Sequence, residues 1–349
     1  MPITRRTLLV AASAVPLASL ASVKTVKSIL KPKALRDGDT IAIISPSSSV
    51  QGPADLEKAR RNVESLGFKV KTGAHASNSW GYLAGTDEHR AADINDAFED
   101  SEVSGIICVK GGYGAARLLD RLNYDAIHRN PKVLLGYSDI TALILAIYAK
   151  AGVVTFHGPV ALSTYSAFDL QNITKTIRTA EPAGLLAVPS TPEGHPPQPL
   201  AATLSPGKAR GRLIGGNLSL VASLVGSPYL PSFAGHILFL EDIGEEPYRI
   251  DRMLNTLRIS GAMKGVQGLV FGDFSLRATQ SAEPATSPER EFTMLHVLQN
   301  FADQIRVPAF CGAWIGHIKD KDTLPVGVQA ELDAEARTLT IVESAVTTR

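Results

Sequence analysis

Between residues 40 and 162 the chain alternates short apolar runs with longer amphipathic segments, and this alternation strongly limits the folds open to it. The runs TIAII, GIICV and KVLLG have the length and composition of buried strands, and ADLEKARRNVESLG has the apolar spacing of a helix that ends at a glycine. Alternating strands and helices indicate a parallel sheet with helices on both faces, in which sites form at the carboxyl ends of strands. We therefore predict an α/β fold, with a Rossmann-like domain over residues 34–164.

The remainder of the chain predicts a linker and a second domain. Residues 165–210 contain the Pro-rich, polar stretch VPSTPEGHPPQPLAATLSPG, which indicates an interdomain connection with one short helix. From 211 to 345 strand-like and helical segments alternate again, and QAELDAEARTLTIVE predicts a terminal hairpin. A chain of 349 residues is long enough for two domains with separate cores.

Residues 1–30 are expected to be an export signal and leader. Arg5 and Arg6 lie before an uncharged stretch that ends in small residues suited to cleavage, and this stretch is short for a membrane span. The paired arginines resemble a twin-arginine signal; a general secretory signal and an uncleaved anchor are the alternatives. We expect a periplasmic or exported protein without a stable membrane span.

Composition argues against several classes of partner. A formal net charge of +1 and the lack of a basic stripe disfavour nucleic acid. The two cysteines, Cys108 and Cys311, lie in apolar runs and are expected to be buried thiols. The scattered histidines show none of the spacings typical of zinc sites, so we expect neither a metal nor a cofactor.

Three polar residues follow apolar runs that predict strands: Ser138 after VLLGY, Glu241 after HILFL, and His317 after AFCGAWIG. A serine hydroxyl becomes a nucleophile when an imidazole takes its proton, and a carboxylate orients that imidazole. Ser138 also precedes a long apolar helix, as a nucleophile at a strand-to-helix corner would, and the N–H of Asp139 could then face an oxyanion. The set is that of a serine hydrolase.

Each of the three residues also has a simpler explanation. Serine before a helix is commonly an N-cap, Glu241 lies in an acidic stretch typical of a solvated loop, and a histidine after glycine is commonly a surface residue. The Gly-x-Ser-x-Gly pattern of many hydrolases is absent around Ser138.

The stretch KGGYGAARLL has glycines at 111, 112 and 114 after a predicted strand, and the following AARLLDRL is expected to be a helix. Glycine leaves backbone N–H groups uncovered, which suits an anion or an oxyanion. A dinucleotide-binding loop is disfavoured because Arg117 occupies the position of its third glycine. A plain tight turn is the alternative.

A family resemblance favours the catalytic interpretation. The strings KGGYGAARLLD, LLGYSDITAL, FHGP, GGNLSLVASLVGSPY, FLEDIGEEPYRIDRML, GLVFGDF and GHIKDKDTLPVG together resemble the LD-carboxypeptidase family, which includes murein tetrapeptide carboxypeptidases and microcin C immunity peptidases. The similarity runs from about residue 34 to 343, in the order of the family's motifs.

The resemblance implies a set of roles. Ser138 would be the nucleophile, Glu241 the carboxylate and His317 the general base, with the N–H groups of Gly112 and Asp139 as the oxyanion hole. The nucleophile's α/β domain would be joined to a C-terminal domain with a barrel-like sheet, and the protein would be a homodimer.

The implied reaction is removal of a terminal D-amino acid, D-alanine, from peptidoglycan tetrapeptide stems. Lys110 stands where the family commonly has arginine and is a candidate substrate-binding residue. The alternatives are a peptidase that detoxifies a microcin-type antibiotic and a non-catalytic periplasmic muropeptide-binding protein.

Overall fold

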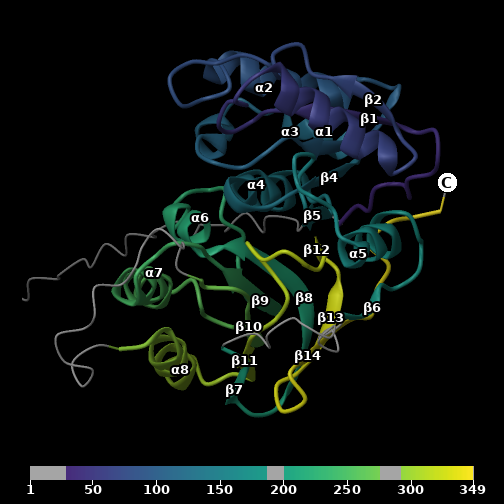
Figure 1. The fold of residues 1–349 in the computed structure, drawn as a ribbon. Helices are drawn as coiled ribbons and strands as arrows, with labels where there is room; N and C mark the ends of the chain where they lie inside the picture. Colours follow the sequence, from purple (N-terminus) through teal and green to yellow (C-terminus); the bar gives the residue numbers. More distant parts are fainter. Residues whose placement is uncertain (1–28, 187–199, 276–291, 349) are drawn as a thin grey trace, which may run out of the picture.

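Two sheets, each with its own helices, lie one above the other (Figure 1). The computed structural model describes residues 29–186, 200–275 and 292–348. Nearly all of the expected export signal and most of the Pro-rich stretch lie outside these residues. No helix within the described ranges has the length and apolar character needed to cross a bilayer.

The first sheet has six strands in the order β12-β5-β4-β3-β1-β2. Five of them are parallel, and β12 pairs with β5 in the antiparallel direction. The strands are β1 (Thr40–Ile44), β2 (Lys69–Thr72), β3 (Val103–Cys108), β4 (Val133–Gly136), β5 (Thr155–His157) and β12 (Leu324–Val326). The connecting helices are α1 (Pro53–Ser65), α2 (Asp87–Glu99), α3 (Tyr124–Arg129) and α4 (Thr141–Ala151). The predicted alternation is confirmed.

The second sheet has eight strands in the order β6-β14-β13-β8-β9-β10-β11-β7. Its four central strands are parallel, and they are β8 (Lys208–Asn217), β9 (His236–Glu241), β10 (Gly268–Phe271) and β11 (Ala309–Cys311). The antiparallel flanks are β6 (Gly184–Leu186), β7 (Ala202–Ser205), β13 (Gln329–Asp333) and β14 (Thr338–Ile341). Helices α6 (Leu218–Ser223), α7 (Pro247–Ile259) and α8 (Met294–Ile305) lie along one side, at the left of Figure 1.

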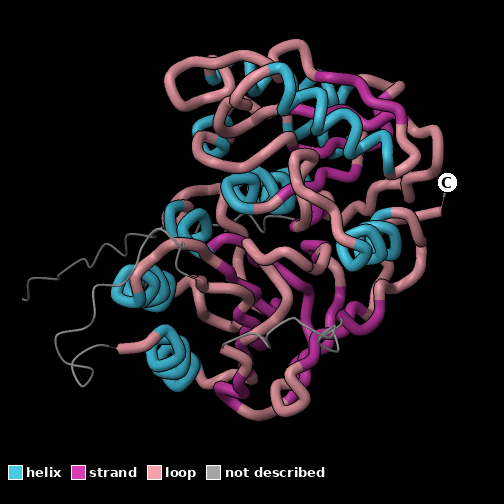
Figure 2. Tube along the Cα trace, viewed as in Figure 1, coloured by secondary structure: helices cyan, strands magenta, loops and turns pink. Residues whose placement is uncertain are grey.

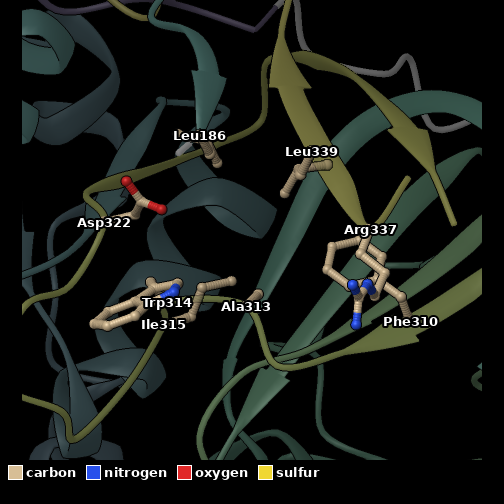
Figure 3. A pocket seen from close by; sticks show the side chains of 8 residues that line it. All are labelled: Leu186, Phe310, Ala313, Trp314, Ile315, Asp322, Arg337 and Leu339. Carbon is tan, nitrogen blue, oxygen red and sulfur yellow. The ribbon is translucent and has the colours of Figure 1, made fainter. Parts of the chain in front are cut away.

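This second sheet curls strongly. Leu186 of β6, Phe310 of β11 and Leu339 of β14 line one small cavity, although β11 lies at the other end of the strand order (Figure 3). The edge strands β6 and β7 do not pair with each other within the described residues. The sheet is therefore barrel-like but open.

Helix α4 connects the two sheets. It lies between them in Figure 2, and nine of its eleven residues are buried, because it contacts strands of both sheets. Near its start, Thr141 Oγ1 accepts a hydrogen bond from the N–H of Asn217 at the end of β8. Near its end, Tyr148 Oη lies 2.9 Å from His236 Nε2 at the start of β9. This packing fixes the end of β4 relative to the ends of β8 and β9.

The structure corrects three expectations drawn from sequence. The segment 165–210 contains the expected helix, α5 (Ala167–Ile177), which has a capping box, but it is not only a connection, because it also forms strands β6 and β7 of the second sheet. Strand β12 lies within the range assigned to the second domain, yet it extends the first sheet. The segment AARLLDRL begins with only a short 3-10 turn, Ala115–Leu118, in place of a helix. Sequence periodicity reports which residues are buried and leaves open which sheet buries them.

Candidate active site

The corner after β4 holds Ser138 in an unusual backbone conformation. Tyr137 continues the strand in extended geometry, and Ser138 has φ 62°, in the left-handed region that side-chain-bearing residues seldom adopt. A 3-10 turn, Ser138–Ile140, then leads into α4. Strain of this kind persists where the surrounding structure imposes it, and it is typical of nucleophile elbows.

The side chain of Ser138 does not cap the helix. Neither the 3-10 turn nor α4 has a side-chain hydrogen bond at its N-cap. The glycine loop lies directly against the serine, since a Cβ added to Gly111 would lie 3.2 Å from Ser138 Oγ. The capping interpretation is therefore wrong, and the hydroxyl faces the glycine-rich loop.

Asp139 ties this corner to two other loops. Its buried Oδ2 accepts hydrogen bonds from Ser47 Oγ at 2.6 Å and from the N–H of Ala115 at 2.8 Å. Burial raises the pKa of Asp139, and these hydrogen bonds act against the rise. The carboxylate thus fixes the loop after β3 beside Ser138.

Gly112 occupies a position in that loop where only glycine fits. Its φ is 120°, and a Cβ there would lie 2.3 Å from Ser48 Oγ. Within the described residues, the N–H groups of Gly112 and Asp139 donate to no backbone or side-chain acceptor. Both N–H groups are free to donate to a ligand near Ser138.

Glu241 ends β9 and is completely buried. Its Oε2 lies 2.8 Å from His317 Nδ1, and its Oε1 lies 3.6 Å from Nε2 of the buried His157 at the end of β5. Burial alone would raise the pKa of Glu241, but the two imidazoles outweigh it and lower that pKa to about 2. An ionised carboxylate only accepts hydrogen bonds, so Nδ1 of His317 carries the proton and Nε2 is the ring nitrogen left able to accept one.

His317 lies further from its strand than the sequence predicts. Strand β11 ends at Cys311, and the next residues form a loop because Gly312 and Gly316 take positive φ angles of 92° and 109°. A Cβ at Gly316 would lie 2.6 Å from Glu241 Oε2. Glycine at this position therefore allows the loop to bring His317 against the carboxylate.

Tyr137 connects the serine corner to the imidazole pair. Its ring centroid lies 4.9 Å from that of His317 and 6.1 Å from that of His157. No hydrogen bond joins Ser138 to His317 among the described residues, and such contacts commonly tighten only when substrate binds. The structure thus places Ser138, Glu241 and His317 in one region, at the carboxyl ends of strands from both sheets.

Sequence reasoning gave no part in the serine site to two residues that lie in it. His157 directly follows the apolar run VVTF, the same signal that selected Glu241, so the sequence could have indicated it. Lys321, whose ammonium lies 5.5 Å from the Tyr137 ring centroid, has no comparable signal. The candidate Lys110 donates to the carbonyl of Ser49 at 3.3 Å.

The structure also bears on the cysteines and on possible metal-binding groups. Both cysteines are buried and free, as predicted. No group of three or more histidine, cysteine or acidic side chains with the arrangement of a metal site occurs in the described ranges.

Comparison with known proteins agrees with a two-domain hydrolase. Residues 41–158 match the family model described as LD-carboxypeptidase N-terminal domain, and residues 210–332 match the LD-carboxypeptidase C-terminal domain. The chain belongs to the LD-carboxypeptidase family, which confirms the resemblance seen in the sequence.

Individual relatives span almost the whole chain. A probable murein peptide carboxypeptidase of Bacillus subtilis is 38% identical over 89% of this chain and 94% of its own length. The murein tetrapeptide carboxypeptidase of Pseudomonas aeruginosa is 33% identical over 84% and 92%. The solved structure of MccF in complex with glutamyl sulfamoyl guanosine superposes with a TM-score of 0.79 at 26% identity, over 91% of this chain and all of that one. Carboxypeptidase activity on murein peptides is supported by these relatives.

Proposed function

We propose that the protein is a serine LD-carboxypeptidase that removes the terminal D-amino acid, D-alanine, from peptidoglycan tetrapeptide stems. The observation that carries the proposal is the 2.8 Å contact of His317 Nδ1 with the buried Glu241 carboxylate, beside a serine held at φ 62°. Relatives named for murein peptides support the substrate class.

In the proposed reaction Ser138 Oγ attacks the carbonyl carbon of the bond between the L-centre and the terminal D-residue. Nε2 of His317 takes the hydroxyl proton and then gives it to the departing amine, and water hydrolyses the acyl-enzyme in the same manner. Glu241 stays ionised, holds the ring through Nδ1 and stabilises the imidazolium.

The proposed oxyanion hole consists of the N–H groups of Gly112 and Asp139. These groups are free, and they belong to the two loops that the Asp139 carboxylate joins. Backbone donors held rigidly in this way stabilise the negative charge of a tetrapeptide's tetrahedral intermediate without reorganising. Lys110, close to this loop in sequence, is a further proposed substrate contact.

The direct test is mass spectrometry of tetrapeptide muropeptides after incubation with the purified protein. We expect loss of one D-alanine to give the tripeptide, no reaction when the terminal residue is L-alanine, and no product with Ser138→Ala. Activity should persist in a strong chelator, because serine, histidine and glutamate suffice for the chemistry. An unchanged tetrapeptide would contradict the proposal.

A second candidate is a peptidase that detoxifies an aminoacyl-sulfamoyl nucleotide, the kind of molecule bound in the MccF structure. Such a substrate has an amide that the same serine could cleave. Competition between a tetrapeptide and glutamyl sulfamoyl adenosine separates the two functions, because the preferred substrate has the higher kcat/KM. Tight binding of muropeptides by the wild-type protein, with no detectable turnover, would favour the third alternative, a binding protein.

We further propose that the mature protein is exported and dimeric. Support for export comes from Arg5, Arg6 and the uncharged stretch that follows them. Support for a homodimer comes from the family resemblance alone. An exported enzyme of this kind would act directly on cell-wall peptides.

A further inference from the structure

The loop after β11 buries three ionisable side chains in a row. Asp320, Lys321 and Asp322 are 8%, 6% and 4% exposed. Charged residues are seldom buried to this extent unless paired or hydrogen-bonded, so each of them requires a physical account.

The ammonium of Lys321 is under-satisfied. It has three N–H donors, but within the described residues its only hydrogen-bond acceptor is the carbonyl of Lys319 at 3.3 Å. It forms no ion pair with a described carboxylate. Burial lowers the pKa of Lys321, while the negative charges of Asp169, Asp320 and Glu241 act in the opposite direction. The site therefore holds a cation with free hydrogen-bonding capacity.

The Lys321 ammonium lies close to the aromatic ring that contacts His317. It lies 5.5 Å from the centroid of the Tyr137 ring, and that ring lies 4.9 Å from the His317 ring. In the proposed reaction His317 protonates the leaving nitrogen. The terminal carboxylate carbon is about 2.5 Å from that nitrogen, because only the α-carbon separates them. A cation that binds the carboxylate must therefore lie on the His317 side of the site, and both the Lys321 ammonium and the His317 ring lie close to the Tyr137 ring.

We propose that Lys321 binds the free α-carboxylate of the terminal residue and thereby makes the enzyme a carboxypeptidase; this inference rests on the function proposed above. The carboxylate supplies the acceptors that the ammonium lacks, and burial of the ammonium strengthens the pairing. The Tyr137 ring beneath the ammonium keeps it directed toward the site.

The test compares a tetrapeptide with a free terminal carboxylate and the same peptide as its C-terminal carboxamide. Wild-type protein should prefer the acid in kcat/KM. Lys321→Met should lower kcat/KM for the acid roughly 10- to 100-fold, the effect of losing a charged hydrogen bond, and leave the amide nearly unchanged. Lys321→Arg should restore part of the preference, and Lys319→Met, an exposed neighbour, is the matched control.

Calorimetry in the Ser138→Ala background measures the same acid-over-amide preference without turnover. Failure of the proposed function appears as no cleavage by the wild type, whereas failure of this inference appears as an acid-over-amide preference that survives Lys321→Met in both assays. Equal loss for both peptides, or loss of the preference in Lys110→Met only, would also overturn it. Should Lys321→Met fail to fold, as shown by its melting curve, Lys321→Gln replaces it.

Discussion

Ser138 combines two properties that a purely structural residue would not need: a positive φ and a hydroxyl without a capping role. The glycine loop lies directly against this side chain, since a Cβ added to Gly111 would lie 3.0 Å from Ser138 Cβ and 3.2 Å from Ser138 Oγ. Backbone strain lowers stability and is found mostly at functional sites, so a strained serine at this corner favours a catalytic role over a structural one.

Replacing Ser138 should separate activity from stability. We expect both Ser138→Ala and Ser138→Gly to lower kcat by roughly 10³-fold or more, because the nucleophile is lost. Ser138→Gly should be more stable than Ser138→Ala by about 1 kcal/mol, since glycine adopts φ 62° without strain. Urea unfolding and peptide hydrolysis check these values, and Ser138→Ala retaining activity within about tenfold would contradict the nucleophile.

His157 should act as a positioning residue. It is buried against Glu241 Oε1 and the ring of Phe239, which lies 5.3 Å away between centroids. In His157→Phe the carboxylate loses one of its two imidazole neighbours and can rotate away from His317. We expect kcat to fall roughly 10- to 100-fold with little change in KM.

The same variant gives a pH signature. The pKa of Glu241 is lowered to about 2 in the folded state, from an ordinary 4.5, so its ionisation stabilises the fold above that ordinary value and the contribution is lost as pH falls toward 2. His157→Phe should raise the folded-state pKa and move acid unfolding to higher pH, as followed by circular dichroism. An unchanged acid transition together with unchanged kcat would assign His157 to packing alone.

At the scale of elements, the β4–α4 corner depends on one carboxylate. Asp139→Ala should destabilise the protein by roughly 2 kcal/mol, because the buried Ser47 hydroxyl and the Ala115 N–H lose their acceptor. We also expect kcat to fall under conditions in which the variant is still fully folded, since the loop carrying Gly112 is no longer fixed. Ser47→Ala removes only one of the two hydrogen bonds to Asp139 and is the control. Equal losses of stability and activity in the two variants would contradict the idea that Asp139 joins the two loops.

In the loop after β11, burial makes ionisation of the Asp322 carboxyl unfavourable. Burial raises the pKa of Asp322 to about 8, and its Oδ1 has no hydrogen-bond partner among the described residues. The folded state therefore retains a proton that the unfolded chain releases near 3.8, so this residue lowers stability progressively as pH rises from about 4 to about 8. Asp322→Asn mimics the protonated form.

Thermal unfolding should show this dependence directly. We expect Asp322→Asn to raise the melting temperature, with a gain over wild type that grows between pH 5 and about 8. The exposed Glu335→Gln serves as the control and should show no such growth. A gain that is constant with pH would contradict the ionisation argument.

At the scale of the whole molecule, the two sheets are interlocked. Strand β12 belongs to the second half of the chain but pairs with β5 of the first sheet. In addition, the backbones of Lys33 and Thr347 pair in an isolated β-bridge. The proposed site draws Ser138 and His157 from one sheet, and Glu241 and His317 from the other. Relative movement of the halves would therefore separate the hydroxyl from its base.

Export is a property of the whole chain that can be tested in cells. Replacing Arg5 and Arg6 with lysine should retain the protein in the cytoplasm if the twin-arginine route is used, as judged by fractionation and immunoblotting. The exported form should lack about the first 20 residues by mass spectrometry. Unimpeded export of the double variant would contradict the route, and light scattering of the mature protein tests the dimer.

The sequence by itself determined the local features of this protein. Apolar period and glycine positions predicted the order of strands and helices, the corner at Ser138 and the terminal hairpin, because each depends on residues close together in the chain. Motifs around Ser138, Glu241 and His317 indicated the same family that the comparisons show.

Tertiary structure alone decided how distant residues meet. The sequence does not reveal that β12 joins the first sheet, that β6 and β7 extend the second, or that His157 and His317 lie on opposite oxygens of Glu241. These features depend on side-chain packing between segments far apart in the chain, and hydrophobic burial is non-directional, so an apolar run specifies that it is buried without specifying its neighbour.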